Sequence, residues 1–183
     1  RYIYKSGDGD DRIADLGTSG TDRLVLDILP NQIAYALRLG PDSSDLVLRL
    51  PGARDRIILQ DALGTRPEGI EEIEFADGTI WTRSDMRVAA LNFAQTAGSD
   101  NVQGFAGNDT IAAGLGDDVL IGGDGSDTYV VRRGDGHDRI REVISATNVD
   151  RVIFENYVSS EVAVERLYKG SDTVVFRFLS SGD

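Results

Sequence analysis

Length, composition and charge exclude several classes of protein. The chain has 183 residues, 40% of them hydrophobic, and a formal net charge of −12, so it is long enough for one sizeable core or two small ones. The acidic excess argues against nucleic acid and anionic membrane surfaces as partners. No run of 18 apolar residues occurs, so no transmembrane segment is predicted. Cysteine is absent, which leaves bound metal ions rather than disulfides to stabilise the fold.

The first predicted elements form a small β domain over residues 1–94. Alternating apolar and polar residues predict strands at 23–26, 33–39, 45–50 and 55–60. Two further strands, 73–76 and 79–82, flank Asp77-Gly78, a dipeptide typical of a two-residue hairpin turn. The order of these short segments indicates an all-β protein.

A short helix is predicted to follow at residues 84–94. Thr82 and Asp85 have the spacing of a capping box at its start. Apolar residues recur at helical spacing and are expected to face the core. They are Met86, Ala89, Ala90 and Phe93.

Residues 98–141 contain a repeat rich in glycine and aspartate. An aspartate recurs every nine residues, with glycine two positions before it and an apolar residue two positions after it. These aspartates are Asp100, Asp109, Asp118 and Asp127, and a stretched copy, GDGHDRIR, adds Asp138. Between Val88 and Val131 there are six acidic residues and no lysine or arginine. Because stacked carboxylates repel one another, this composition favours a bound cation.

The nine-residue period predicts a coil of alternating turns and very short strands. Glycine adopts positive φ at little cost, so each glycine-rich segment can turn sharply. Turns two repeats apart then stack on the same edge, which places Asp100, Asp118 and Asp138 in one column and Asp109 and Asp127 in the other. Such stacked carboxylates, together with inward carbonyl groups, make an all-oxygen cage suited to calcium.

These repeats resemble the RTX, or haemolysin-type, nonapeptide repeats with the consensus G-G-x-G-x-D-x-U-x. The segment GGDGSDTYV at 122–130 fits that consensus at every position. Gln95, Thr96, Phe105 and Ala113 depart from it, and the first two weaken the outermost site. The resemblance implies a calcium-binding parallel β-roll over residues 95–141, flanked by small antiparallel β caps.

The resemblance also implies a set of ligands for Ca²⁺. Pairing Asp100 with Asp118, Asp118 with Asp138, and Asp109 with Asp127 predicts about three sites. Turn carbonyl groups are expected to complete them, and the residues implied are Gly104, Ala106, Ala113, Gly114, Leu115, Gly116, Gly123, Gly125, Gly134 and Gly136.

A second and longer repeat spans the chain. YIYKSGDGDDRI from Tyr2 matches YVVRRGDGHDRI from Tyr129, 127 residues later, and the similarity continues after a slip of one residue. Residues 142–183 are therefore predicted to begin a second, incomplete capping unit. The first copy, with its GDG turn and its FADGTIW segment at 75–81, resembles the domain that accompanies haemolysin-type repeats. We expect it to cap the roll and cover its open strand edge.

Other chemistries are less favoured by the residues. His137 is the only histidine, and Asp10 occupies its place in the other copy, so it is interpreted as a variable turn residue and not as a catalytic or zinc-binding one. Asp11 would need a preceding repeat to complete a site. Phe75 and Trp81 are interpreted as core residues in preference to a carbohydrate platform. A glycosidase pair of carboxylates is defined by a distance that the sequence does not contain.

Function follows from the resemblance. It implies a non-enzymatic, calcium-responsive folding module of a bacterial protein that is exported through a type I secretion channel and acts outside the cell or at its surface. Its partners would be calcium ions, that channel in transit, and neighbouring copies of the module. A calcium-stiffened stalk, surface layer or matrix fibre is one alternative. An accessory region of a secreted lipase, protease or cytolysin is another, and the chain itself has the character of a piece of a longer protein.

Overall fold

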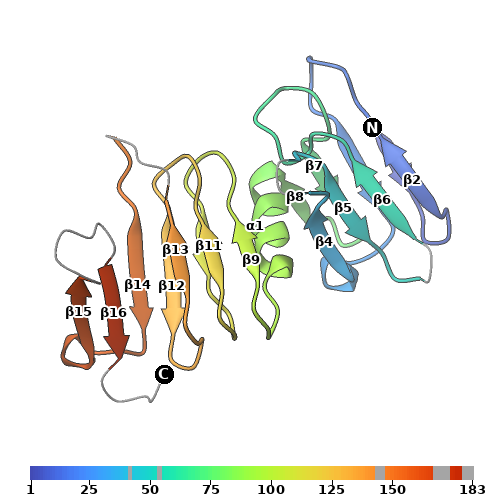
Figure 1. Ribbon diagram of the computed structural model, residues 1–183. Helices are drawn as coiled ribbons and strands as arrows, with labels where there is room; N and C mark the ends of the chain where they lie inside the picture. The colour runs from blue at the N-terminus through green and yellow to red at the C-terminus, as the bar shows by residue number, and fades with distance from the viewer. Residues whose placement is uncertain (41–42, 53–54, 143–146, 167–173, 179–183) are drawn as a thin grey trace. The chain divides into compact units, whose positions relative to one another are not determined.

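A computed structural model describes residues 1–40, 43–52, 55–142, 147–166 and 174–178 (Figure 1). The chain divides into two compact units, Arg1–Ala94 and Gln95–Asp183. Apart from one α-helix and short 3-10 helices, the described elements are strands, so the predicted all-β class is confirmed. None of the described helices has the length and apolar character needed to cross a membrane.

The first unit contains two four-stranded sheets. One has the order β1 (Tyr2–Tyr4), β3 (Arg23–Leu26), β7 (Glu72–Glu74) and β8 (Ile80–Thr82). The other has the order β2 (Asp10–Ile13), β6 (Arg56–Leu59), β5 (Leu46–Arg49) and β4 (Tyr35–Arg38). Antiparallel caps were expected, whereas β1–β3, β3–β7 and β2–β6 are parallel pairs. The sheets are mixed because the chain passes from β1 into the other sheet and returns as β3, which makes one coil like those of a roll.

Fully buried aliphatic side chains of these strands form the core of the first unit, among them Leu24, Leu46, Ile57 and Ile73. The helix α1 (Arg83–Ala94) packs near β4. Its capping box is present, because the Thr82 N–H donates to Asp85 Oδ2 at 2.8 Å.

One predicted contact of α1 is wrong. Met86, Ala89 and Ala90 are buried, but Phe93 is 38% exposed and Leu91 is buried instead. The guanidinium of Arg87 donates to the carbonyls of Leu63 and Gly64. Arg87 and Leu91 lie one turn apart on the same face of α1. Because Arg87 is anchored, this face is turned inward in the last turn of the helix, and the face that contains Phe93 is left exposed.

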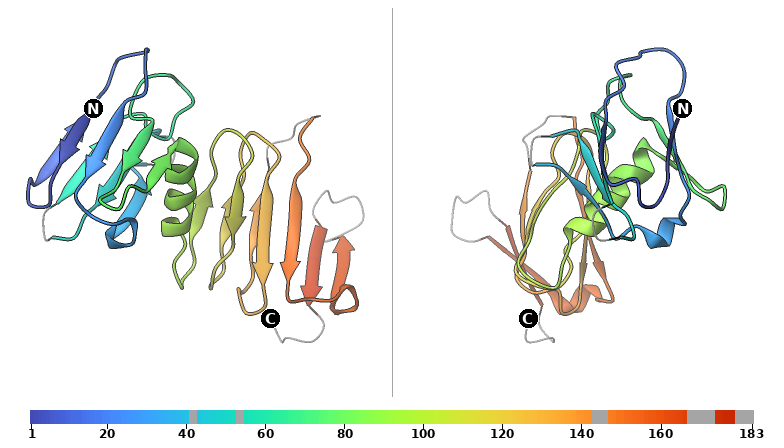
Figure 2. Two further views of the ribbon diagram at one scale, coloured as in Figure 1. Left: turned by 180° about the vertical axis from the view of Figure 1, so that it is seen from behind. Right: turned by 90° about the vertical axis from the view of Figure 1, so that its right-hand side faces the viewer.

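The second unit is built on a parallel β-roll, as predicted. One sheet consists of β9 (Asn101–Gln103), β11 (Val119–Ile121) and β13 (Arg139–Arg141), and the other of β10 (Thr110–Ala112), β12 (Thr128–Arg132) and β14 (Arg151–Glu155). All these pairs are parallel. The end-on view in Figure 2 shows the yellow and orange segments superimposed as a flattened coil. The second side chain of each of the first four strands is fully buried between the sheets: Val102, Ile111, Leu120 and Tyr129.

The roll sheet extends past residue 141. β14 lies in the segment assigned from sequence to the second cap, yet it pairs with β12 over five residues, from Thr128 opposite Arg151 to Arg132 opposite Glu155. After it, β15 (Val162–Arg166) and β16 (Val174–Phe178) form an antiparallel pair. The end of the roll and the start of the second long unit therefore share β12 and β14.

The long repeat is also visible in the structure. Tyr129 lies opposite Val152 in the β12–β14 pair, and Tyr2 lies opposite Leu24 in the β1–β3 pair. The turn that follows is closed in the same way in both copies. The Lys5 N–H donates to Asp8 Oδ2 at 2.9 Å, and the Arg132 N–H donates to Asp135 Oδ2 at 2.6 Å.

Candidate metal centre

The repeat aspartates are joined into two ladders along the roll. In the first, the Asp100 N–H donates to Asp118 Oδ1 at 2.7 Å, and the Asp100 carbonyl accepts from the Val119 N–H at 2.9 Å. The structure thus places Asp100, Asp118 and Asp138 in one column and Asp109 and Asp127 in the other. The remaining N–H to Oδ1 bonds are Asp109 to Asp127 at 2.8 Å, Asp118 to Asp138 at 3.1 Å, and Asp127 to Asp150 at 3.0 Å.

Three of these carboxylates have an oxygen atom that the protein does not satisfy. Oδ2 of Asp118, Asp127 and Asp138 is buried and has no hydrogen-bond partner in the described part of the chain. The whole residues Asp118 and Asp127 are 1% and 0% exposed. A buried charged oxygen without a partner costs free energy, and a divalent cation would remove that cost. The donor set therefore fits a hard cation with oxygen ligands.

The pKa values of two aspartates in these columns also favour a bound cation. Burial raises the pKa of Asp138 to about 6, and the charges of Asp118, Asp135 and Asp117 add to that rise. Burial also raises the pKa of Asp127. In the protein alone, burial therefore makes both carboxyl groups easier to protonate than an ordinary aspartate, because it removes solvent from the charged form.

The first aspartate of each column has a different environment. Asp100 Oδ2 accepts from the Thr96 N–H at 2.6 Å and from its hydroxyl at 2.8 Å. Asp109 Oδ2 accepts from the Phe105 N–H at 2.6 Å. Both carboxylates close their own turns, at the places where the repeats depart from the consensus. A cation at these positions has to compete with those bonds.

Glycine is required where the turns stack. Gly116, Gly125 and Gly136 have φ values of 124°, 132° and 113°, a region that L side chains rarely occupy. A Cβ on Gly116 would lie 2.6 Å from the carbonyl carbon of Gly98, and a Cβ on Gly125 would overlap the carbonyl oxygen of Gly107. Only bare backbone fits between neighbouring turns, which keeps carbonyl groups and carboxylates close together.

The residues predicted to supply carbonyl ligands all lie in the turns between the strands β9 to β13. They are Gly104 and Ala106 in one turn, Ala113 to Gly116 in the next, Gly123 and Gly125 in the third, and Gly134 and Gly136 in the fourth. Within the described turns, the carbonyls of Ala106, Leu115, Gly123 and Gly125 accept no backbone hydrogen bond. Their lone pairs are therefore available to water or to an ion.

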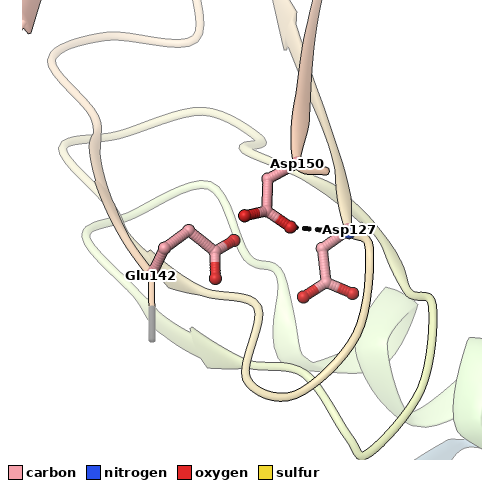
Figure 3. Close-up of side chains that lie close together, drawn as sticks. All are labelled: Asp127, Glu142 and Asp150. Carbon is pink, nitrogen blue, oxygen red and sulfur yellow. Dashed lines mark hydrogen bonds between the residues drawn. The ribbon is translucent and has the colours of Figure 1, made fainter. Parts of the chain in front are cut away.

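Sequence reasoning missed two acidic residues at the end of the roll. Glu142 and Asp150 lie beside Asp127, and one carboxylate oxygen from each of the three lies within 4.8 Å of the others (Figure 3). A signal for Asp150 was present, because Val152 follows it at the same two-residue spacing as in the repeats. Glu142 follows β13 and carries no repeat signal.

The other candidates from the sequence have ordinary structural roles. His137 is exposed in its turn, and its N–H donates to Asp117 Oδ1 at 3.0 Å. Phe75 is buried and packs edge to face with Trp81, with 4.9 Å between the ring centroids. Asp11 is exposed on β2.

Comparison with known proteins agrees with this geometry. The family model described as RTX calcium-binding nonapeptide repeat (4 copies) matches residues 96–129. The model described as Haemolysin-type calcium binding protein related domain matches residues 45–85. No curated protein matches the chain. Repeats of the RTX family are structural modules that bind Ca²⁺, so calcium is the cation for these turns. The chain therefore carries RTX, haemolysin-type calcium-binding repeats at residues 96–129, and its residues 45–85 match the domain related to such proteins.

Proposed function

We propose that the chain is a calcium-dependent folding module of a bacterial protein exported by type I secretion. About three ions would be held between the stacked turns, by the pairs Asp100 and Asp118, Asp118 and Asp138, and Asp109 and Asp127, with turn carbonyls as further ligands. The observation that carries the proposal is the buried, unpartnered Oδ2 of Asp118, Asp127 and Asp138. The module is proposed to have no catalytic activity of its own.

The roll depends on a cation because its own apolar core is small. The strands β9, β10 and β11 have three residues and bury one central side chain each, such as Leu120 in β11. That burial has to offset the chain entropy of long glycine-rich turns, while carboxylates stacked two repeats apart repel one another. Without calcium the Gly/Asp-rich segment is therefore proposed to be unfolded, and with calcium to fold.

By mass action, folding of the roll then depends on the calcium concentration around the chain, which differs inside and outside the cell. Calcium that binds only the folded roll stabilises it by about 1.4 kcal/mol per site when its concentration is tenfold above the dissociation constant. Extracellular modules bind calcium at about 10⁻⁴–10⁻³ M. The low calcium of the bacterial cytosol would leave the segment unfolded and able to pass a channel, and millimolar calcium outside would fold it.

Far-UV circular dichroism during a calcium titration from EDTA tests this function. We expect a steep transition from coil to β signal with calcium, and none with magnesium at the same concentration, because Mg²⁺ is smaller and demands near-octahedral geometry. A spectrum that is fully folded in EDTA and indifferent to calcium would contradict the proposal.

A structural array is a second candidate, and the repeated long unit favours it. The same pairing and the same turn hydrogen bonds occur around Tyr2 and again around Tyr129. Further copies in the parent protein would build a calcium-stiffened rod. Small-angle X-ray scattering of the full-length protein tests this candidate. A large increase in the maximum dimension on adding calcium supports a rod, and a compact particle in both conditions contradicts it.

A further inference from the structure

We propose that Asp127, Glu142 and Asp150 form an additional calcium site at the end of the roll, where the aspartate of the last nonapeptide repeat meets two acidic residues outside the repeats. It differs from the paired sites proposed above because three side-chain carboxylates contribute to it. The proposal concerns where calcium binds, and it holds whether or not folding depends on calcium.

The three carboxylates come from separate segments of the second unit. Asp127 ends the turn before β12, Glu142 follows β13, and Asp150 precedes β14. One oxygen atom of each lies within 4.8 Å of the other two. Figure 3 shows the three carboxylate groups facing a common space. Asp127 is buried, Glu142 is half-buried and Asp150 is exposed, so the space has a buried floor and an open side through which an ion can enter.

Besides the proximity of the three acids, the buried side chain of Asp127 points to a ligand. Its side chain is fully buried, and Oδ1 accepts the Asp109 N–H at 2.8 Å. Its Oδ2 is buried in this cluster and has no hydrogen-bond partner among the residues that the structure describes. Within the described part of the chain, neither Asp127 nor Asp150 forms an ion pair with a basic side chain. A cation is the group that would satisfy this oxygen.

Gly122 keeps the space free for these carboxylates. A Cβ at this position would overlap Asp127 Oδ2 and would lie 2.6 Å from Glu142 Oε1. The absence of a side chain therefore lets the two acidic groups approach each other. Close approach of two carboxylates is unfavourable without a counter-charge.

Hydrogen bonding explains the orientation of the cluster but not its composition. The Tyr129 hydroxyl donates to Glu142 Oε1, and the Asp127 N–H donates to Asp150 Oδ1 at 3.0 Å. A glutamine and an asparagine could accept the same bonds without charge. The hydrogen bonds therefore do not require acidic side chains, whereas binding of a cation requires their negative charge. Variants that keep the hydrogen bonds and remove the charge can test the site.

Calcium is the cation that this arrangement favours. The ligands are all oxygens, and Ca²⁺ accepts six to eight of them in flexible geometry, whereas Mg²⁺ demands near-ideal octahedral geometry. A third carboxylate raises the negative charge around the ion, and charge count is one of the factors that sets calcium affinity. The site would join the end of β13 to the starts of β12 and β14, and so close the last coil of the roll.

Calcium stoichiometry measured by equilibrium dialysis of the whole chain tests the proposal. Glu142→Gln and Asp150→Asn each keep a hydrogen-bond acceptor and remove a charge, so each variant is expected to bind one ion fewer than the unaltered chain. Glu155→Gln is the matched control, because Glu155 lies on β14 with a half-exposed partner, Arg132. It should bind the full number of ions. Full stoichiometry in both Glu142→Gln and Asp150→Asn would overturn the proposal.

A crystal of the unaltered protein grown with calcium provides a measurement that does not depend on variants that fold. An anomalous-difference peak surrounded by Asp127, Glu142 and Asp150 supports the site. Peaks between the repeat turns with none at this cluster would overturn it and leave the proposed function intact. Peaks at this cluster with none between the repeat turns would support the site and count against the proposed function.

Discussion

The N–H of Asp109 donates a hydrogen bond of 2.8 Å to Oδ1 of Asp127, while Oδ2 of the same carboxylate is buried without a partner. One oxygen of Asp127 thus aligns two turns of the roll, and the other is left for an ion. The same division recurs at Asp118 and Asp138, whose Oδ1 atoms accept from Asp100 and Asp118. Alignment and cation binding can therefore be separated by substitution.

Asp127→Asn should separate alignment of the turns from cation binding at the most buried of these aspartates. Asparagine can still accept the Asp109 N–H, but it lacks the charge that holds calcium. We expect the calcium midpoint of folding to move to a higher concentration, with a loss of about 1.4 kcal/mol at calcium tenfold above the dissociation constant for each site removed. Circular dichroism during a calcium titration measures the midpoint. Asp124→Asn, at an exposed position of the same turn, is the control, and equal shifts in both variants would contradict the assignment.

Acidification should affect the calcium-free and calcium-bound roll in opposite directions. Burial raises the pKa of Asp138 to about 6 in the folded chain, against about 3.9 for an unfolded aspartate. A raised folded pKa contributes stability that is fully present below the unfolded value and is lost as the pH rises through the folded value. Lowering the pH from 7 towards 4 should therefore stabilise the roll when calcium is absent.

With calcium present, protons compete for the same carboxylate, so the calcium midpoint should rise as the pH falls below about 6. Titrations at pH 7.5 and pH 5 measure both effects, and Asp138→Asn should reduce both. The prediction would be contradicted if acid destabilised the calcium-free roll between pH 7.5 and pH 5. In that case, protonation of the buried carboxylates would not dominate the dependence of its stability on pH.

Two glycines with positive φ should differ in their tolerance of alanine. Gly134 has a φ of 91° and open space around a hypothetical Cβ, so Gly134→Ala should cost about 1–2 kcal/mol from backbone strain alone. Gly125→Ala adds an overlap with the backbone of Gly107 and should push the stacked turns apart. Urea unfolding in saturating calcium compares the two, and equal losses would show that the stacking is looser than the structure indicates.

Removing the cap of α1 should act on the first unit only. The Thr82 hydroxyl donates to Asp85 Oδ2 at 2.6 Å, and loss of such a cap costs about 0.5–2 kcal/mol. Thr82→Ala should lower the thermal midpoint of the first unit and leave calcium stoichiometry unchanged. Asn92→Ala, at an exposed position of the same helix, serves as the reference substitution. A change in the number of bound ions would show that the two units do not fold separately.

The regular period made the register of the roll predictable. Because the aspartates recur every nine residues, Leu120 had to lie beside Val102 two repeats away, and the structure pairs them. The columns could be extended to Asp138 across a slightly stretched repeat for the same reason. Asp150 was missed because the spacing grows to twelve residues after Asp138, and Glu142 was missed because it reaches the cluster from a different segment.

Interactions within the first unit were less predictable, because they depend on tertiary partners. The Asp77-Gly78 turn was predicted to have two residues, but the Phe75 N–H donates to the Thr79 carbonyl at 2.9 Å and Gly78 has a φ of 84°. Three residues therefore separate the last paired positions, with Gly78 relieving the strain. In the same way, Arg87 selects which face of α1 is buried through bonds to a loop that is distant in the sequence.

Hydrogen–deuterium exchange, measured by peptide in EDTA and in millimolar calcium, tests the central claim most directly. Amides of residues 98–141 should be protected only in calcium, because the stacked turns need a cation between their carboxylates. Peptides from Arg1–Ala94, which has its own core, should be protected in both conditions. Equal protection of residues 98–141 with and without calcium would contradict the claim and reduce the repeats to turns that stack without an ion.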